Sequence, residues 1–229
     1  MRASAREWMT VHTAPFFSIL TAMALSVDWY FDFVSPFSYI CLHRLEELQQ
    51  QLSVEVSYKP VLFAGLLNHW GQKGPAEIPA KRRWTYRWCT WWANELGITF
   101  RFPAAHPFNP LGHLRLAIAA GSTPRVVRRI FDSLWTTGEH PERQFGELCE
   151  ELGIDAAGLS RAKDVLRRNT EEAAAAGVFG VPTFVADGEV FWGADAVDFL
   201  KAFLKDEGVL RNEEMRRVDN LPVGAARKS

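Results

Sequence analysis

Strand-forming patterns lie near the two ends of this chain, and this arrangement constrains its fold most strongly. Val27 to Phe33 is aromatic and β-branched, as in a buried strand, and Val54 to Lys59 alternates between apolar and polar residues. Between them, Ser35 and Pro36 begin a helix that reaches about Gln51, because serine caps helices and proline is favoured at their first position. The first block is therefore β-α-β, and we expect a right-handed crossover.

The second block of strands lies close to the C-terminus. Thr183 to Ala186 and Glu189 to Trp192 flank Asp187 and Gly188, and Asp-Gly between two apolar runs is a strong hairpin signal. Asp195 to Leu204 follows with helical spacing of its apolar residues. This block is therefore β-β-α.

About 115 residues with helical patterns separate the two blocks. We predict helices over Val61–His69, Ala80–Leu96, Asn109–Ala120, Pro124–Thr137, Gln144–Leu152 and Leu159–Gly177, with a Gly- and Pro-rich loop over Gly71–Pro79. The order predicts an α/β fold, in which a thioredoxin-like βαβ…ββα domain (residues 27–60 and 178–206) carries an inserted all-helical domain (residues 61–177). Residues 207–229 form a polar tail that we expect to pack loosely.

Charge and cysteine content exclude several classes of protein. The 26 Lys and Arg residues balance 27 Asp and Glu residues, so a dedicated nucleic-acid-binding protein is not expected. Cys41, Cys89 and Cys149 are widely spaced without a C-x-x-C pair, which argues against a disulfide framework or zinc site and fits a reducing cytoplasm. The histidines show no metal-ligand spacing, so we expect no metal site. No apolar stretch is long enough to span a bilayer.

The first 26 residues form an N-terminal extension with two possible explanations. Ala14 to Ser26 is mostly apolar and follows Arg2 and Arg6, which is the outline of a signal peptide. Alternatively, translation begins at Met23, which leads directly into the first predicted strand. We favour the second explanation, because Glu7 and His12 weaken the signal-peptide pattern.

The first candidate site is the sequence Ser35-Pro36-Phe37-Ser38, between the first strand and its helix. Thioredoxin-like folds carry their redox C-x-x-C at this position, and serine at both cysteine positions excludes direct thiol–disulfide exchange. A serine hydroxyl at a helix N-terminus can instead donate a hydrogen bond to a ligand thiolate and lower the pKa of that thiol. The alternative is that Ser35 only caps the helix.

The second candidate site precedes the hairpin. A proline directly before a strand suggests a cis peptide bond between Val181 and Pro182. The backbone N–H and C=O of Val181 could then pair with an extended peptide ligand. A plain turn is the alternative, but a thioredoxin-like fold would place this segment opposite the Ser35 motif.

At this point the sequence resembles the 2-hydroxychromene-2-carboxylate isomerases, a family related to kappa-class glutathione transferases and DsbA-type oxidoreductases. The matching segments are FDFVSPFSY (31–39), KPVLFAGLL (59–67), GPAEIPAKRRW (74–84), RFP (101–103) and GVFGVPTFVADGEVFWGAD (177–195). Together they extend over most of the chain.

The resemblance implies that glutathione is the cofactor. Ser35 matches the catalytic serine that holds the glutathione sulfur. The matching glutathione-binding positions are Gln72, Lys81, Val181, Pro182, Ala194 and Asp195. The sequence departs from the family pattern at Ala196, where arginine is common, and at Gln72, which replaces an asparagine.

Cationic and aromatic residues on the helix after Pro79 offer a substrate-binding surface. Lys81 and its two arginine neighbours lie in the first turn, where cations oppose the helix dipole, so they face either an anionic ligand or solvent. Four tryptophans follow at helical spacing, and either pack within the helical domain or form one wall of a slot for an aromatic substrate. We assign Phe37, Trp84 and Asn109 to substrate binding, although a helix cap is the alternative role of Asn109.

The leading hypothesis is a glutathione-dependent isomerase. The resemblance implies interconversion of 2-hydroxychromene-2-carboxylate and trans-o-hydroxybenzylidenepyruvate in aromatic catabolism such as naphthalene degradation, through reversible addition of a thiolate. One alternative is a kappa-like glutathione transferase that conjugates electrophiles, and another is a non-catalytic thioredoxin-fold binding protein. The resemblance also implies a homodimer, with a small aromatic molecule as its substrate.

Overall fold

One mixed sheet joins the two strand blocks. The computed structural model describes residues 25–225, so the expected signal-peptide outline and the start at Met23 fall almost wholly outside it. Strands β1 (Leu25–Phe31), β2 (Val54–Pro60), β3 (Thr183–Ala186) and β4 (Glu189–Trp192) form a sheet in the order β2-β1-β3-β4. β1 is parallel to β2 and antiparallel to β3, so the predicted union of the two blocks is confirmed.

The bounds of β1 differ from the prediction at both ends. Leu25 and Ser26, which we assigned to the N-terminal extension, pair with β2 and belong to the sheet. The strand ends at Phe31, before the predicted end at Phe33, because Asp32 begins the turn into the next helix. Residues 32–34 therefore form a loop. Hydrogen bonds to the Asp32 side chain and backbone, and not sheet pairing, set its shape.

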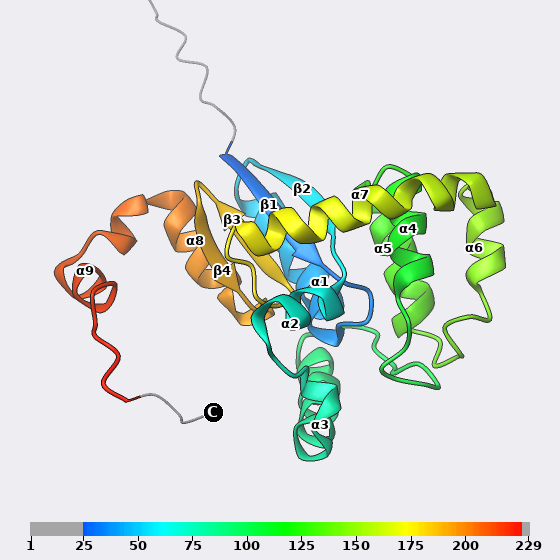
Figure 1. Ribbon diagram of the computed structural model, residues 1–229, viewed down its shortest axis with the longest axis horizontal. Helices are drawn as coiled ribbons and strands as arrows, with labels where there is room; N and C mark the ends of the chain where they lie inside the picture. Colours follow the sequence, from blue (N-terminus) through cyan, green and yellow to red (C-terminus); the bar gives the residue numbers. More distant parts are fainter. Residues whose placement is uncertain (1–24, 226–229) are drawn as a thin grey trace, which may run out of the picture.

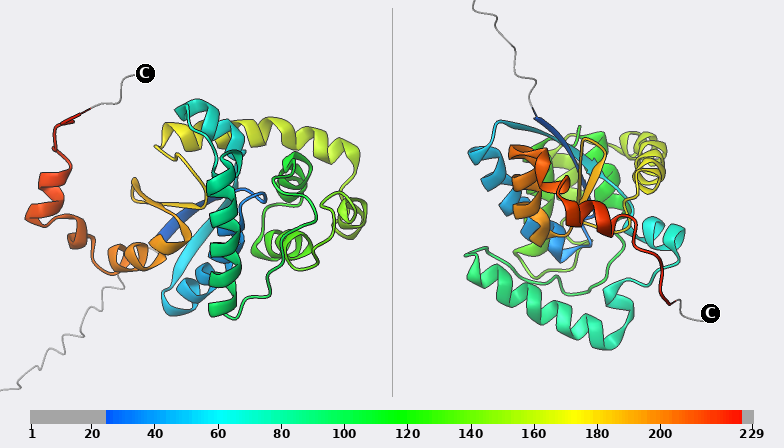
Figure 2. Two further views of the ribbon diagram at one scale, coloured as in Figure 1. Left: turned by 90° about the horizontal axis from the view of Figure 1, so that it is seen from below. Right: turned by 90° about the vertical axis from the view of Figure 1, so that its left-hand side faces the viewer.

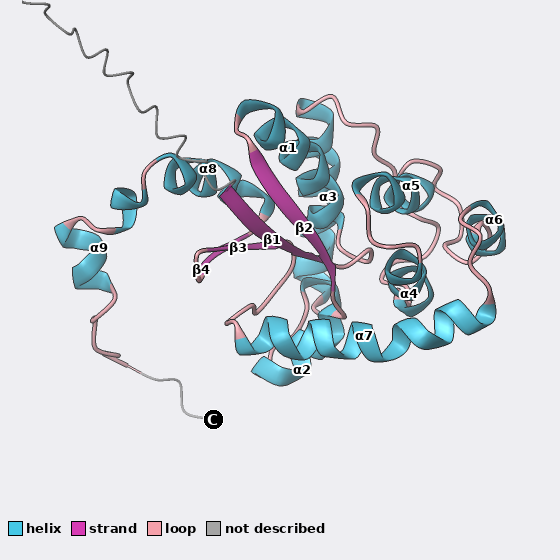
Figure 3. Cartoon of the chain, turned by 90° about the horizontal axis from the view of Figure 1, so that it is seen from above, coloured by secondary structure: helices cyan, strands magenta, loops and turns pink. Residues whose placement is uncertain are grey.

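Helices cover both faces of the sheet. Helix α1 (Pro36–Gln51) and helix α8 (Val197–Lys205) lie on one face, and the C-terminal part of α7 (Ala156–Ala175) lies on the other (Figure 3). Pro36 occupies the first turn of α1, as predicted. The Asp187–Gly188 turn has positive φ at both residues, which is the conformation that an Asp-Gly hairpin turn requires.

The predicted helices of the central region all form. They are α2 (Phe63–Trp70), α3 (Pro79–Glu95), α4 (Leu111–Ala119), α5 (Pro124–Trp135), α6 (Phe145–Glu151) and α7. α7 begins earlier than predicted because the Asp155 carboxylate accepts the Gly158 N–H and caps it. A single 3₁₀ turn (Pro75–Glu77) interrupts the expected 71–79 loop, and the polar tail contains a 3₁₀ turn (Glu207–Leu210) and α9 (Glu213–Val218).

The helical region shares its core with the sheet. Trp29 and Phe31 of β1 contact the ring of Phe131 on α5, and these three side chains are fully buried. On the opposite face, Asn169 of α7 donates to the Pro60 carbonyl at the end of β2. The central helices therefore pack as a continuation of the thioredoxin-like part, while the domain boundaries stay a prediction.

Helix α3 lies on the outside of the molecule, away from α7 (Figures 1 and 2). Trp84 and Trp91 are 61% and 51% exposed, although Trp92 packs against the core. Packing within the protein therefore does not explain the whole tryptophan stripe. Within residues 25–225, no helix has both the length and the apolar character needed to cross a membrane.

Candidate functional site

Ser35 lies at the N-terminus of α1 and is only 7% exposed. Its backbone is extended, with φ −89° and ψ 115°, and its hydroxyl oxygen accepts the Ser38 N–H at 3.2 Å. The capping role proposed from the sequence is therefore present. The same oxygen lies at the positive end of the helix dipole, where negative charge on a ligand is stabilised.

The Ser35 hydroxyl also faces the second predicted motif. It donates to the Val181 carbonyl oxygen at 3.5 Å, across 146 residues of sequence. The Val181–Pro182 peptide bond is cis, as predicted, and both residues are buried. A contact this long is weak, so the hydroxyl hydrogen can turn to a stronger acceptor at little cost.

A turn after β4 adds a third wall to this cluster. The Gly193 N–H donates to the Pro182 carbonyl at 2.9 Å, and Ala194–Ala196 form a 3₁₀ turn. The last helix therefore starts at Val197 and not at the predicted Asp195, because φ of 105° at Gly193 directs the chain into this turn first. Ala194 is buried beside the site, whereas the side chain of Asp195 is exposed.

Arg44 holds this turn in place and was not identified from the sequence. Its Nη1 donates to the Ala194 carbonyl at 2.9 Å, and its Nη2 pairs with Asp198 at 2.8 Å. The side chain of Arg44 is largely buried, whereas that of Asp198 is exposed. A cation about two turns along the helix from the Ser35 motif offers no local sequence signal for this contact, since the partner is 150 residues away.

Asp32 is a second residue that sequence reasoning left without a role. Its carboxylate is fully buried and accepts the N–H groups of Val34 at 3.0 Å and Phe63 at 2.8 Å. Burial raises the pKa of Asp32 to about 7, although both hydrogen bonds oppose that rise. Asp32 thus links the loop before Ser35 to the start of α2.

The predicted residues from the helical region lie differently. Gln72, Lys81 and Trp84 are exposed, and in the described part of the chain no hydrogen bond or aromatic contact links them to Ser35 or Val181. Asn109 is also exposed, and its Oδ1 accepts the Leu111 N–H at 3.1 Å, which favours the alternative role at the start of α4.

Phe37 lies between the buried cluster around Ser35 and the exposed residues of the helical region. It follows Pro36 in the first turn of α1 and packs against a small cluster of Ile40, Cys89 and Ala93 between α1 and α3. Its ring is partly buried. Phe37 is therefore the predicted substrate-binding residue that lies nearest to Ser35 in sequence and also contacts the helix that carries Lys81 and Trp84.

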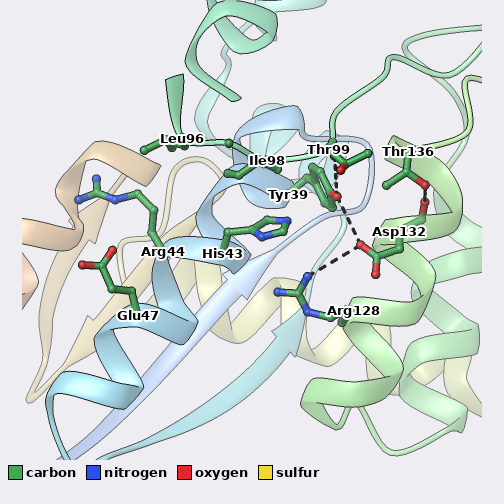
Figure 4. A pocket seen from close by; sticks show the side chains of 11 residues that line it. Tyr39, His43, Arg44, Glu47, Leu96, Ile98, Thr99, Arg128, Asp132 and Thr136 are labelled. Atoms are coloured by element: carbon green, nitrogen blue, oxygen red, sulfur yellow. Dashed lines mark hydrogen bonds and ion pairs between the residues drawn. The ribbon is translucent and has the colours of Figure 1, made fainter. Parts of the chain in front are cut away.

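A separate groove of about 580 Å³ lies along α1, beyond Ser35 (Figure 4). α1, α5 and the segment 96–99 form its walls, and the Tyr39 hydroxyl lies 3.0 Å from the Thr99 carbonyl oxygen and 3.3 Å from Oδ1 of Asp132, so its single hydrogen is shared between these acceptors. Neither Ser35 nor Val181 lines the groove, but Arg44 does. Arg44 is therefore the residue shared by the groove and the Gly193–Ala196 turn.

The Ser35 cluster can stabilise a thiolate but contains no thiol of its own. Cys41 and Cys89 are buried and burial raises the pKa of both, that of Cys89 to about 12, so neither is a thiolate near neutral pH. Within residues 25–225, no hydrogen-bond partner is found for the Val181 N–H. An extended peptide-like ligand that carries a thiol would satisfy that N–H and present its sulfur to Ser35.

Comparison with known proteins gives a consistent result. A 2-hydroxychromene-2-carboxylate isomerase of Sphingobium xenophagum is 29% identical, over 80% of this chain and the whole of that protein. A kappa 2 glutathione S-transferase of Caenorhabditis elegans is 24% identical, over 82% of this chain and 96% of that protein. A solved structure of a 2-hydroxychromene-2-carboxylate isomerase superposes with a TM-score of 0.69 at 26% identity, covering 83% of this chain and 99% of the other.

The family comparison covers nearly the whole fold. Residues 26–205 match the model of the DsbA-like thioredoxin domain, which includes the sheet, the central helices and the last helix packed on the sheet. The serine N-cap, the cis proline and the strand order β2-β1-β3-β4 agree with that match. This chain belongs to the DsbA-like thioredoxin domain family.

Proposed function

We propose that this protein is a glutathione-dependent isomerase of the 2-hydroxychromene-2-carboxylate type, acting in the breakdown of aromatic compounds. The observation that carries the proposal is the placement of the Ser35 hydroxyl between the N-terminus of α1 and the Val181 carbonyl. Serine replaces the cysteines that disulfide exchange needs, while the surroundings still suit a thiolate. Relatives named as isomerases of this type support the choice of reaction.

The roles of the residues follow from their positions. Bound glutathione would supply a thiolate that adds reversibly to a conjugated substrate, so that a double bond becomes free to rotate. Ser35 would donate a hydrogen bond to the sulfur and lower its pKa, supported by the dipole of α1. Val181 would pair with the backbone of the tripeptide, and the Asp195 carboxylate would receive its ammonium group.

The exposed side chains of the helical region would complete the binding sites for glutathione and for the aromatic substrate. Lys81 offers a cation for a glutathione carboxylate and Gln72 offers an amide. The Trp84 ring stacks on Trp88, with centroids 5.6 Å apart, and presents an open aromatic face for a flat substrate. Phe37 would contact the substrate on the side of α1, and Asn109 would supply a polar group at the same slot.

A kappa-like glutathione transferase is the second candidate, favoured by the similarity to a kappa-class enzyme. Analysis of the products separates the two. The purified protein is incubated with 2-hydroxychromene-2-carboxylate, with and without glutathione. An isomer formed only with glutathione, which is recovered unchanged, supports the isomerase. A stable glutathione conjugate supports the transferase, and the absence of any glutathione-dependent reaction contradicts the isomerase.

We further propose a homodimer in the reducing cytoplasm. The exposed Trp91 on α3 provides apolar surface that a partner subunit would cover, and the three cysteines are free. Sedimentation analysis tests the assembly. We expect a dimer that dissociates when Trp91 is replaced by glutamate, and a monomeric parent protein would contradict the proposal.

A further inference from the structure

A histidine from the helical region touches the backbone directly before Ser35. His106 lies in the loop between α3 and α4, and its Nε2 is 2.7 Å from the Val34 carbonyl oxygen. A carbonyl oxygen can only accept, so Nε2 must carry the hydrogen of this bond. The tautomer of His106 is therefore set by its contact with the loop that precedes Ser35.

Tyr86 on α3 fixes the other side of the imidazole. Its hydroxyl lies 2.6 Å from Nδ1 of His106 and 2.8 Å from the carbonyl oxygen of the same residue. With the hydrogen on Nε2, Nδ1 and the His106 carbonyl oxygen are both acceptors, and the Tyr86 hydroxyl shares its single hydrogen between them. Burial lowers the pKa of His106, which keeps the ring in this neutral form near pH 7.

Aromatic rings hold the imidazole from several directions. Phe102 and Trp135 lie with their centroids 5.5 Å from that of His106, and Phe108 lies at 6.1 Å. The ring thus has little freedom to rotate about its side-chain bonds, and the hydrogen bond to Val34 keeps a fixed direction.

Both peptide groups of Val34 are restrained. Its N–H is bound by the Asp32 carboxylate at 3.0 Å and its carbonyl by His106 at 2.7 Å. The next N–H, that of Ser35, donates to the Asp32 carbonyl at 3.1 Å. Of these three restraints, the one from His106 is supplied by the helical region.

We propose that His106 is a positioning residue for Ser35, oriented by Tyr86, which fixes the loop that aims the serine hydroxyl. This inference deepens the proposed function and rests on it for the catalytic readout. Without the His106 bond, the peptide between Val34 and Ser35 is held only through its N–H, which donates to the Asp32 carbonyl, so it can tilt, and the hydroxyl and the first N–H groups of α1 are less well aligned. The thiol would still bind but would be stabilised less as a thiolate.

Three variants test the proposal. His106→Leu removes the donor, and His106→Gln keeps an N–H that can reach Val34. Tyr86→Phe removes only the hydroxyl that orients the ring. His140→Gln, at an exposed histidine, is the matched control. Steady-state kinetics, the ultraviolet absorbance of the bound thiolate against pH, and amide hydrogen exchange at Ser35 and Ser38 are measured on each.

We expect His106→Leu to lower kcat about tenfold with a KM for glutathione within about twofold of the parent, since a small misplacement of a reacting group has this cost. The pKa of the bound thiol should rise, and exchange at Ser35 and Ser38 should accelerate. His106→Gln should keep most of the parent kcat. The kcat of Tyr86→Phe should lie between those of His106→Leu and the parent. His140→Gln should change nothing.

The readouts separate this inference from the proposed function. If the parent protein shows no glutathione-dependent reaction, the proposed function fails, but faster exchange at Ser35 and Ser38 in His106→Leu still supports positioning. Unchanged exchange in a folded His106→Leu variant overturns the inference whatever the activity. Failure of His106→Leu to fold, together with parent-like kinetics and exchange in Tyr86→Phe and His106→Gln, also counts against it.

Discussion

The two sides of the candidate site differ in how far they are formed in the protein alone. On the sheet side, Ser35, Val181 and Ala194 are buried and tied together by hydrogen bonds through Pro182 and Arg44. On the helical side, the assigned side chains are exposed and no contact among the described residues joins them to the cluster. The first side is preorganised, whereas the second must lose side-chain entropy when a ligand binds. We therefore expect Ser35, on the sheet side, to govern kcat, and the binding contacts of the helical side and of the Gly193–Ala196 turn to govern KM.

Replacing Ser35 removes the central hydroxyl of the preorganised side and should have the largest effect on kcat. Ser35→Ala removes the donor to the thiolate, so we expect kcat to fall by a factor on the order of 10², as for loss of a donor to developing charge. Loss of the cap should also lower the free energy of unfolding by about 1 kcal/mol. Glutathione kinetics and chemical denaturation measure the two effects.

Ser38→Ala is the matched control, because the Ser38 hydroxyl is buried without a hydrogen-bond partner in the described residues. Removing an unpaired buried hydroxyl should leave activity and stability close to those of the parent. Equal losses of kcat in the two alanine variants would show that the preorganised cluster does not depend on Ser35 in particular.

Lys81→Ala tests the exposed side. Its side chain is exposed and lies in the first turn of α3, where a cation opposes the helix dipole, so stability should not fall. Loss of one charge-assisted contact should raise the KM for glutathione about tenfold, with kcat within about twofold. Arg83→Ala, from the same exposed turn, is the control and should have little effect. A drop in kcat with an unchanged KM would reverse the proposed division between the two sides.

Arg44→Met tests the contribution of the Gly193–Ala196 turn without changing Ser35. The variant keeps the apolar part of the side chain but leaves the Ala194 carbonyl without its donor, so the Gly193–Ala196 turn should loosen. We expect the KM for glutathione to rise by roughly threefold to fivefold, in line with loss of one charge-assisted hydrogen bond partly replaced by water. Asp198→Ala removes only the exposed ion pair of Arg44. If Asp198→Ala raises KM as much as Arg44→Met, the Ala194 contact is not the cause.

For Asp32 the expected effect is on the pH dependence of stability. Burial raises its pKa in the folded protein to about 7, above its ordinary value of 3.8. Between these values the folded state holds a proton that the unfolded state releases, so this contribution is complete below pH 3.8 and is lost as pH rises towards 7. Asp32→Asn should remove that slope, measured by denaturation from pH 4 to 8. An identical slope in the variant and the parent would assign it to other groups.

The sequence was sufficient to predict the helices and strands and the part of the candidate site formed by Ser35, Val181 and Pro182. Alternation, Ser-Pro at a helix start and Asp-Gly in a hairpin are local signals, and the contacts of Ser35 with Val181 follow once the fold is assigned. The roles of Arg44, Asp32 and His106 escaped prediction, because each binds a backbone group of another segment, and every residue carries the same backbone groups whatever its side chain. The sequence left open whether the tryptophans of α3 pack or face a substrate, since apolar residues at helical spacing do not show which of them a neighbouring element covers; in the structure Trp84 is exposed.

The serines at positions 35 and 38 have a consequence for tolerance to oxidants. A thioredoxin-type centre built on cysteines is switched off when its thiols are alkylated or overoxidised. Here Cys41 and Cys89 are buried and Cys149 is partly buried, so the reactive sulfur would arrive with the ligand and leave with it. Damage would therefore fall on a replaceable small molecule, and the activity would follow the supply of reduced thiol in the surrounding solution while the polypeptide remained intact.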